Sequence, residues 1–258
     1  PDQPDKVIPF AGGAWHQLRS SAALGQFLHE LLERAAQGRF ALDPSSPLTQ
    51  ELRETLAHSG WSAQADVILE WLSVVARTPL APWGVALSGL DLARAELEFW
   101  LPLQPIMIEQ LDGWCRRHIW PGRERPPLRP AELEGLLMGY ADLVFHHQGR
   151  YAVLDYKSNR LGSDPAAYSA PALAEAILAH RYDVQAAIYL LALHRLLQRR
   201  MGAGYQADRH LGPAQFLFLR GIDHPSAGVI DIAIGAKPMD ELDALVGHPV
   251  VPLDGSVR

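Results

Sequence analysis

Two short segments of the chain carry aspartates in otherwise apolar surroundings. The first, residues 139–145, reads Gly-Tyr-Ala-Asp-Leu-Val-Phe with Asp142 at its centre. The second, residues 151–157, reads Tyr-Ala-Val-Leu-Asp-Tyr-Lys and includes Asp155 and Lys157. Both have the composition of β-strands, and the His-His-Gln-Gly-Arg between them is typical of a tight turn. We therefore predict a hairpin that presents these three side chains.

The length of the turn decides which residues of the hairpin face each other. A turn centred on residues 148–149 places His147 opposite Arg150, and counting outward then pairs Asp142 with Asp155. A four-residue loop about the same centre gives the same pairing, whereas a three-residue loop breaks it. Directly opposed residues hold their Cβ atoms about 4.5–5.5 Å apart. Two carboxylates at that separation repel, so one takes a proton unless a cation lies between them.

Lys157 extends this pair into a set that could cleave a phosphodiester. Period-two alternation puts it on the same face as Asp155. A hard divalent cation such as Mg²⁺ prefers oxygen ligands, and an ammonium beside it can position a water and steady a phosphate. A second interpretation is a surface salt bridge between Asp155 and Lys157, with Asp142 a strand-end residue. The spacing alone leaves both open.

The elements that must position these residues are predicted from periodicity and from Pro and Gly. Prolines and glycines concentrate at 121–130, which we interpret as a boundary or a long surface loop. Helices followed by a mixed run of strands and helices favour a layered α/β or α+β domain. The predicted helices are 21–38, 49–58, 63–77, 105–119, 170–180, 181–201 and 238–246, and the predicted strands are 94–103, 133–146, 150–157, 214–221 and 228–234.

Composition narrows the class of protein. The 258 residues are 48% hydrophobic and 20% charged, which is typical of a globular protein, and no apolar run reaches the roughly 18 residues of a membrane helix. One cysteine, Cys115, excludes a four-cysteine iron–sulfur site and fits a reducing cytoplasm. The polar, proline-broken start predicts that residues 1–20 are a linker remnant of a larger protein.

Charge gives a mixed indication about nucleic acid. The net charge of −6 mildly disfavours it as a partner. Arginine is nevertheless clustered, and arginine clusters suit contacts with phosphate, although solvated faces are an equal interpretation. The two clusters are Arg116, Arg117, Arg123, Arg125 and Arg129, and then Arg195, Arg199 and Arg200.

The hairpin strings closely resemble the C-terminal nuclease domain of RecB-type subunits, from bacterial RecBCD helicase–nucleases. That domain belongs to the PD-(D/E)xK restriction-endonuclease-like class. The resemblance covers roughly residues 20–235. Its most specific part is 135–195, and it is also carried by residues 24–31 and 216–221.

The resemblance implies a fold and a domain organisation. The fold is an α/β restriction-endonuclease-like core, a central mixed β-sheet flanked by helices, with an N-terminal helical region. Residues 21–258 would form this domain, with the helical part at about 21–90 and the catalytic core at about 91–246. The chain has no G-x-x-x-x-G-K-[ST] phosphate loop, so the helicase motor of a RecB subunit is not expected within it.

The resemblance also assigns roles to the metal centre. Asp142 and Asp155 would be metal-binding carboxylates, the backbone carbonyl of Tyr156 another ligand, and Lys157 the catalytic lysine. His29, from the first predicted helix, would complete the metal shell. From the residues alone, a helical histidine is more often solvated or satisfied in a core.

Three further residues are expected beside the centre. Glu96 and Glu98 share a face of a predicted strand, and Glu96 is preferred as the acidic residue that the family has in this region. For either glutamate, a solvent-facing position is an equal interpretation. Gln185 and Tyr189 lie at i and i+4 of a helix, like Gln-x-x-x-Tyr pairs beside the active site in this family. Ordinary polar packing in the core is the alternative for this pair.

The implied function is Mg²⁺-dependent hydrolysis of DNA phosphodiesters in double-strand-break repair and recombination. Mn²⁺ would substitute for Mg²⁺, and no iron–sulfur cluster is expected. The implied partners are single- and double-stranded DNA and RecC-like and RecD-like subunits, with no membrane, in a bacterial cytoplasm. The alternative is a non-catalytic module that docks on partner subunits and DNA.

Overall fold

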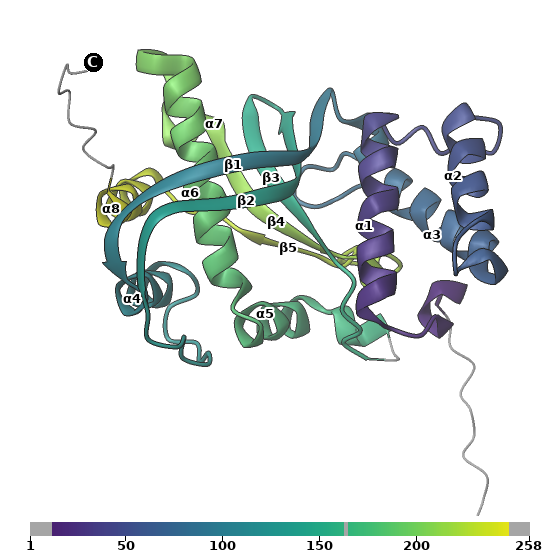
Figure 1. Cartoon of the computed structure of the whole chain (residues 1–258), viewed down its shortest axis with the longest axis horizontal. Helices are drawn as coiled ribbons and strands as arrows, with labels where there is room; N and C mark the ends of the chain where they lie inside the picture. The colour runs from purple at the N-terminus through teal and green to yellow at the C-terminus, as the bar shows by residue number, and fades with distance from the viewer. Residues whose placement is uncertain (1–11, 163–164, 248–258) are drawn as a thin grey trace, which may run out of the picture. The chain divides into compact units, whose positions relative to one another are not determined.

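The computed structural model describes residues 12–162 and 165–247 (Figure 1). Its sheet has five strands in the order β1-β2-β3-β4-β5, so β1 and β5 are the edges, and helices flank it. The predicted fold class, an α/β core with a mixed sheet, is confirmed. The strands are β1 (Leu92–Met107), β2 (Glu132–His147), β3 (Arg150–Lys157), β4 (Leu211–Phe218) and β5 (Val229–Ile232).

The helices begin and end close to the predicted positions. The largest differences are at α4, which begins three residues late, and at α7, which the sequence did not predict. The helices are α1 (Ala22–Gln37), α2 (Pro47–Ala57), α3 (Ala65–Arg77), α4 (Ile108–His118), α5 (Ala170–Ala179), α6 (Tyr182–Met201), α7 (Ala207–His210) and α8 (Ala236–Val246). None of these described helices has the length and apolar character needed to cross a membrane.

The chain divides into two compact units. The first contains the described residues up to Ala93, together with Asp155–Ala176 and Phe216–Ile230. The second contains Arg94–Leu154, Ile177–Gln215 and the described residues from Asp231 onward. The boundary between the two units therefore falls within each of the strands β3, β4 and β5. The predicted split at about residue 90 between a helical part and a catalytic core stays a prediction.

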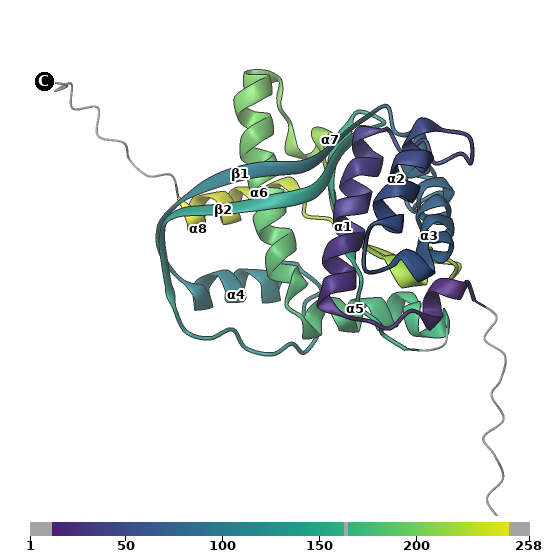
Figure 2. The same cartoon turned by 45° about the vertical axis from the view of Figure 1, so that its right-hand side comes forward.

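Helices α1, α2 and α3 lie together in the first unit (Figure 2). Ser21 and Ser46 cap α1 and α2, each accepting a hydrogen bond from a backbone N–H three residues on. The apolar stripe of α1 is buried as its helical period predicts. Its buried residues include Leu24, Leu28, Leu31, Leu32 and Ala35.

The segment that precedes α1 is packed into the first unit. Trp15 is buried and stacks on Trp71 of α3, with ring centroids 6.2 Å apart. Arg220, which is 1% exposed, donates hydrogen bonds to the backbone carbonyls of Trp15 and Leu18. Of the predicted linker remnant, residues 1–11 lie outside the described residues, and this remaining part is held by Arg220.

In the second unit, β1 and β2 run side by side as two long strands, and α6 lies along one of their faces (Figures 1 and 2). The strand predicted to end at residue 103 continues to Met107, and α4 begins directly after it. Both Pro102 and Pro105 lie within this strand. At the edge of a sheet proline is tolerated, since its missing N–H faces away from the neighbouring strand.

The hairpin of β2 and β3 has the predicted two-residue turn. Gln148 and Gly149 both have positive φ, 50° and 80°, as the turn that suits strand twist in a two-residue hairpin requires. His147 pairs with Arg150, and the antiparallel register continues to Leu143, which pairs with Leu154. The predicted register is therefore confirmed for these five pairs, and a three-residue loop is excluded.

The strand predicted at 214–221 ends early, at Phe218. The next three residues form a 3₁₀ turn that returns the chain over Tyr168. A Cβ atom added at Gly221 would lie 2.7 Å from the Tyr168 Cβ, so only glycine fits this close approach.

Candidate active site

Asp142 lies inside β2, and Asp155 lies near the end of β3. Each is the next residue outward from the last pair of the hairpin register, Leu143 with Leu154. Asp142 is half-buried within a strand that runs on both sides of it, so the interpretation of Asp142 as a strand-end residue is wrong.

In the first unit, Asp155 and Lys157 form an ion pair. The Lys157 Nζ lies 2.6 Å from the Asp155 Oδ2, and the two side chains are only 11% and 5% exposed. The ammonium also lies 5.4 Å from the centre of the Phe216 ring. The two residues do form a salt bridge, but it is buried, so the alternative of a surface salt bridge is wrong. Lys157 shares a face with Asp155, as strand alternation predicted.

Helix α1 packs against the chain that follows this pair. A Cβ atom at Gly25 would lie 2.6 Å from the Ser158 Oγ, so the absence of a side chain lets β3's continuation approach the helix. One turn further along α1, the ring of His29 meets the ring of Tyr156 edge-on at 5.9 Å. His29 is half-buried. Gly25 therefore leaves room for the Ser158 side chain, a contact that the sequence did not identify.

Gln185 and Tyr189 of α6 form one connected chain of hydrogen bonds. The Gln185 Nε2 donates to the Tyr189 Oη at 2.7 Å, and that hydroxyl donates to the backbone carbonyl of Tyr140 at 3.1 Å. Tyr189 also meets the Phe99 ring edge-on. The pair faces inward as predicted, and it fixes the β2 backbone two residues before Asp142.

Of the two candidate glutamates, Glu96 has the unusual backbone. Its φ is 46°, a left-handed conformation that is rare for a residue with a side chain and costs on the order of 1 kcal/mol. Such strain concentrates at functional sites, which favours Glu96 as the sequence did. Glu98 is exposed and lies beside the groove described below. The choice between the two stays a prediction.

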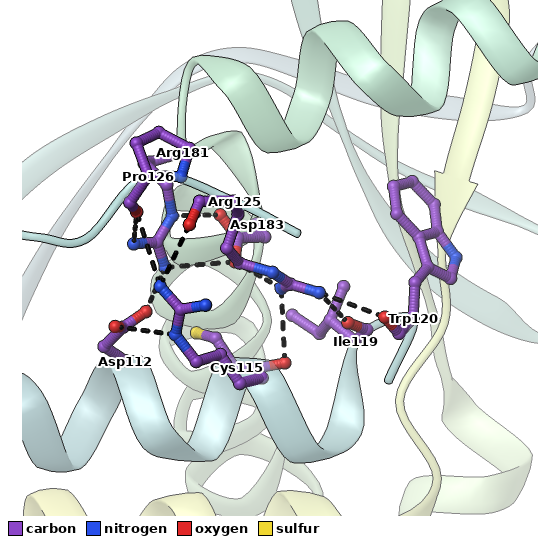
Figure 3. Close-up of polar contacts among 9 residues, drawn as sticks. Asp112, Cys115, Ile119, Trp120, Arg125, Pro126, Arg181 and Asp183 are labelled. Atoms are coloured by element: carbon purple, nitrogen blue, oxygen red, sulfur yellow. Dashed lines mark hydrogen bonds and ion pairs between the residues drawn. The ribbon is translucent and has the colours of Figure 1, made fainter. Parts of the chain in front are cut away.

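A buried charge cluster fixes the start of α6 in the second unit (Figure 3). Arg125, from the long loop after α4, pairs with Asp183 in the first turn of α6, and both side chains are fully buried. The Arg125 guanidinium also donates to the backbone carbonyls of Ile119 and Trp120. Arg181 donates to both Asp183 and Asp112.

The same cluster determines two pKa values. Burial alone would raise the pKa of Asp112, but the hydrogen bonds from Arg116 and Arg181 outweigh it and hold that pKa below its usual range. Burial raises the pKa of the nearby Cys115 thiol to about 12, so the thiol is not a nucleophile at neutral pH. Arg125, which the sequence suggested for phosphate contact or a solvated face, is fully buried, whereas Arg116 stays partly exposed and pairs with Asp112.

The predicted metal ligands come from several elements. Oxygen donors in the form of two carboxylates and a backbone carbonyl suit a hard divalent cation. Within residues 12–162 and 165–247, no three His, Cys, Asp or Glu side chains are grouped closely enough to hold a metal ion. The ligand set of Asp142, Asp155, Tyr156 and His29 therefore stays a prediction.

Comparison with known proteins gives one family. The model of the PD-(D/E)XK nuclease superfamily matches residues 12–220. The RecBCD enzyme subunit RecB of Escherichia coli K12 is 42% identical over 221 residues, which is 83% of this chain and 18% of that subunit. RecB subunits of Haemophilus influenzae and Mycobacterium tuberculosis H37Rv are 36% and 32% identical, over 68% and 80% of this chain and 15% and 21% of those subunits.

The chain thus spans about a fifth of the length of these relatives. The matched segment contains α1, β1, the β2–β3 hairpin and α6, which carry every candidate site residue named above. By this match over most of its described residues, the chain belongs to the PD-(D/E)XK nuclease superfamily.

Proposed function

We propose that this chain is the metal-dependent DNA nuclease domain of a RecB-type subunit that acts in double-strand-break repair and recombination. The observation that carries the proposal is the buried Asp155–Lys157 pair, on a strand whose register with β2 leads directly to Asp142. The superfamily and the RecB relatives support the same reaction class. The reaction is hydrolysis of phosphodiester bonds in single- and double-stranded DNA.

Carboxylate and carbonyl oxygens are hard ligands, so the donor set suits Mg²⁺. Mn²⁺ would substitute for it, because Mn²⁺ also accepts an imidazole ligand. Asp142, Asp155, the Tyr156 carbonyl and His29 would hold the ion. When bound, it supplies electrostatic stabilisation to a scissile phosphate and activation to an attacking water.

The remaining chemistry belongs to the side chains themselves. Lys157 keeps its ammonium beside Asp155 in a desolvated position, where its charge acts strongly on a phosphate anion. Gln185 and Tyr189 hold the β2 backbone next to Asp142 and so keep that carboxylate in place. Glu96 would be a further acidic residue of the centre.

The relatives bear the name of a RecBCD enzyme subunit, and the aligned segment covers only 18% and 15% of their length. We therefore extend the proposal to partners: in the complete protein, this domain would work beside RecC-like and RecD-like subunits. A bacterial cytoplasmic location belongs to the same proposal.

The test is degradation of linear double-stranded and single-stranded DNA by the 258-residue chain in Mg²⁺ and, separately, in Mn²⁺. Lys157→Ala is expected to lower the rate on the order of 1,000-fold. Lys237→Ala is the matched control, because Lys237 is exposed on α8 and far along the chain from the hairpin. Equal rates for the two variants would overturn the mechanism. Absence of both cleavage and Mg²⁺ binding in the wild type would favour the docking module instead.

A further inference from the structure

A groove of about 750 Å³ lies in the second unit, lined by β1 and α6 with small contributions from β2 and β3. Six consecutive residues of β1, from Leu97 to Pro102, line it, so the groove follows the free edge of the sheet. Its floor is apolar and includes Val144, Leu193 and Leu196.

One end of this groove lies next to the predicted centre. Tyr189 and Ala141 line it there. Ala141 is the residue before Asp142, and Tyr189 is hydrogen-bonded to Gln185. A molecule lying in the groove would therefore contact Tyr189, which is itself a candidate site residue, and Ala141, the neighbour of Asp142.

The other end, at the last turn of α6, is basic, and the lining of the groove also includes an exposed aromatic ring. Arg199 and Arg200, both exposed in the last turn of α6, line this end. Arg195 is held by Asp243 through an ion pair, so its charge is already partnered. Trp100 on β1 is 56% exposed, which is unusually high for a large aromatic residue.

We propose that this groove binds a single strand of DNA, with a base stacked on Trp100 and phosphates contacted by Arg199 and Arg200. Aromatic platforms combined with basic grooves bind single strands of any sequence, because every base has a stacking face. The proposal rests on the proposed nuclease function for its substrate class and adds the surface that holds the strand.

The dimensions of the groove fit a short stretch of the strand. Ten helical residues separate Tyr189 from Arg199, which corresponds to about 15 Å at 1.5 Å per residue. At about 3.4 Å for each stacked nucleotide, this length holds about four nucleotides. Charge favours an anionic occupant over a basic one, since the described lining residues include two exposed guanidinium groups, of Arg199 and Arg200, and one carboxylate, Glu98.

The binding experiment separates this surface from catalysis. Fluorescence anisotropy of a labelled oligothymidylate is measured with the 258-residue chain in EDTA, so that no cleavage occurs. Trp100→Ala is expected to weaken binding about tenfold. Its matched control is Leu92→Ala, because Leu92 is equally exposed on β1, at 57%, and does not line the groove.

The arginine pair has a distinct signature. Arg199→Ala/Arg200→Ala is expected to weaken binding and to reduce the slope of log affinity against log salt by about 1.4, because single strands release about 0.7 counterions for each phosphate contact. Arg117→Ala, in an exposed position of α4 that does not line the groove, is the control and keeps the wild-type slope. Circular dichroism checks that each variant is folded.

Kinetics in Mg²⁺ distinguish the two proposals. If the groove binds the strand, Trp100→Ala raises KM for single-stranded DNA and leaves kcat near the wild-type value.

If Trp100→Ala and the arginine double variant bind and cleave like the wild type, the groove proposal is overturned while the nuclease function stands. If the wild type does not cleave but loses DNA binding with these variants, the nuclease function fails and the groove remains. If the wild type binds no oligothymidylate at all, the groove proposal is overturned, and an acidic peptide becomes the competing occupant.

Discussion

Two buried ion pairs of this chain look alike in burial and differ in what they connect. Asp155 and Lys157 lie two residues apart on one strand, so their pairing brings no distant parts of the chain together. Arg125 and Asp183 lie 58 residues apart and join the loop after α4 to the start of α6. The ion pair between Asp155 and Lys157 lies within one strand, whereas the ion pair between Arg125 and Asp183 joins two separate elements.

The two pairs also differ in their surrounding hydrogen bonds. Arg125 uses its planar group to satisfy backbone carbonyls as well as Asp183, and a second arginine, Arg181, shares the same carboxylate. Lys157 presents a single compact ammonium, a group that can approach a phosphate from a flexible stem. Burial of charge is therefore not by itself evidence of a catalytic site, and the elements that the charge connects are more informative.

Removing both charges of the strand pair is expected to separate activity from stability. In Asp155→Asn/Lys157→Met we expect nuclease activity to fall on the order of 1,000-fold or more. The free energy of unfolding is expected to be unchanged or higher, because replacing a buried ion pair with neutral groups of similar size removes a desolvation cost. DNA cleavage and urea unfolding are measured on the same preparation. A stability loss of several kcal/mol would show that this pair is structural.

The equivalent change in the charge cluster is expected to do the opposite. Arg125→Met/Asp183→Asn removes the ion pair and leaves the carbonyls of Ile119 and Trp120 buried without this donor. We expect a loss of about 3–5 kcal/mol in the free energy of unfolding. Arg117→Met, at an exposed position of the same helical region, is the control. Wild-type stability in the double variant would erase the distinction between the two pairs.

The contrast also shows which features the sequence could predict. The hairpin register followed from local information, since Gln148 and Gly149 fix the turn and a period of two fixes the faces. The burial of Lys157 did not, because it depends on Phe216, which is distant in the sequence. Likewise, nothing local indicated that Arg125 would lie inside the protein while Arg117, in the same cluster, stays exposed.

Element boundaries failed where tertiary position overrode a local rule. The strand predicted to end at residue 103 continues to Met107, because β1 is an edge strand and accommodates Pro105 there. The 3₁₀ turn after Phe218 depends on the packing of Tyr168 against Gly221, which no pattern in that segment reveals. Residues that act through distant partners are therefore the ones that sequence patterns miss.

Removing one hydroxyl group tests the support of the site at smaller cost. Tyr189→Phe deletes the group that links Gln185 to the Tyr140 carbonyl and keeps the ring against Phe99. We expect about a tenfold fall in kcat, because the β2 backbone beside Asp142 loses its anchor. The free energy of unfolding is expected to fall by about 1 kcal/mol. Urea unfolding and steady-state kinetics measure both, and an unchanged kcat would assign the pair to core packing alone.

A further expected effect, on stability alone, is a dependence on pH that involves neither ion pair. Burial raises the pKa of Asp231 to about 6, although a hydrogen bond from Gln215 at 2.9 Å opposes the rise. Because the folded state holds this proton more tightly than the unfolded chain, the contribution to stability is complete below about pH 4 and is lost as the pH rises through 6.

Asp231→Asn keeps an acceptor for Gln215 and cannot ionise. We therefore expect the stability of the variant to rise relative to the wild type by on the order of 3 kcal/mol between pH 4 and pH 8, measured as the difference between two series of urea unfolding curves. A difference that does not change with pH would mean that Asp231 has the same pKa in the folded and unfolded states.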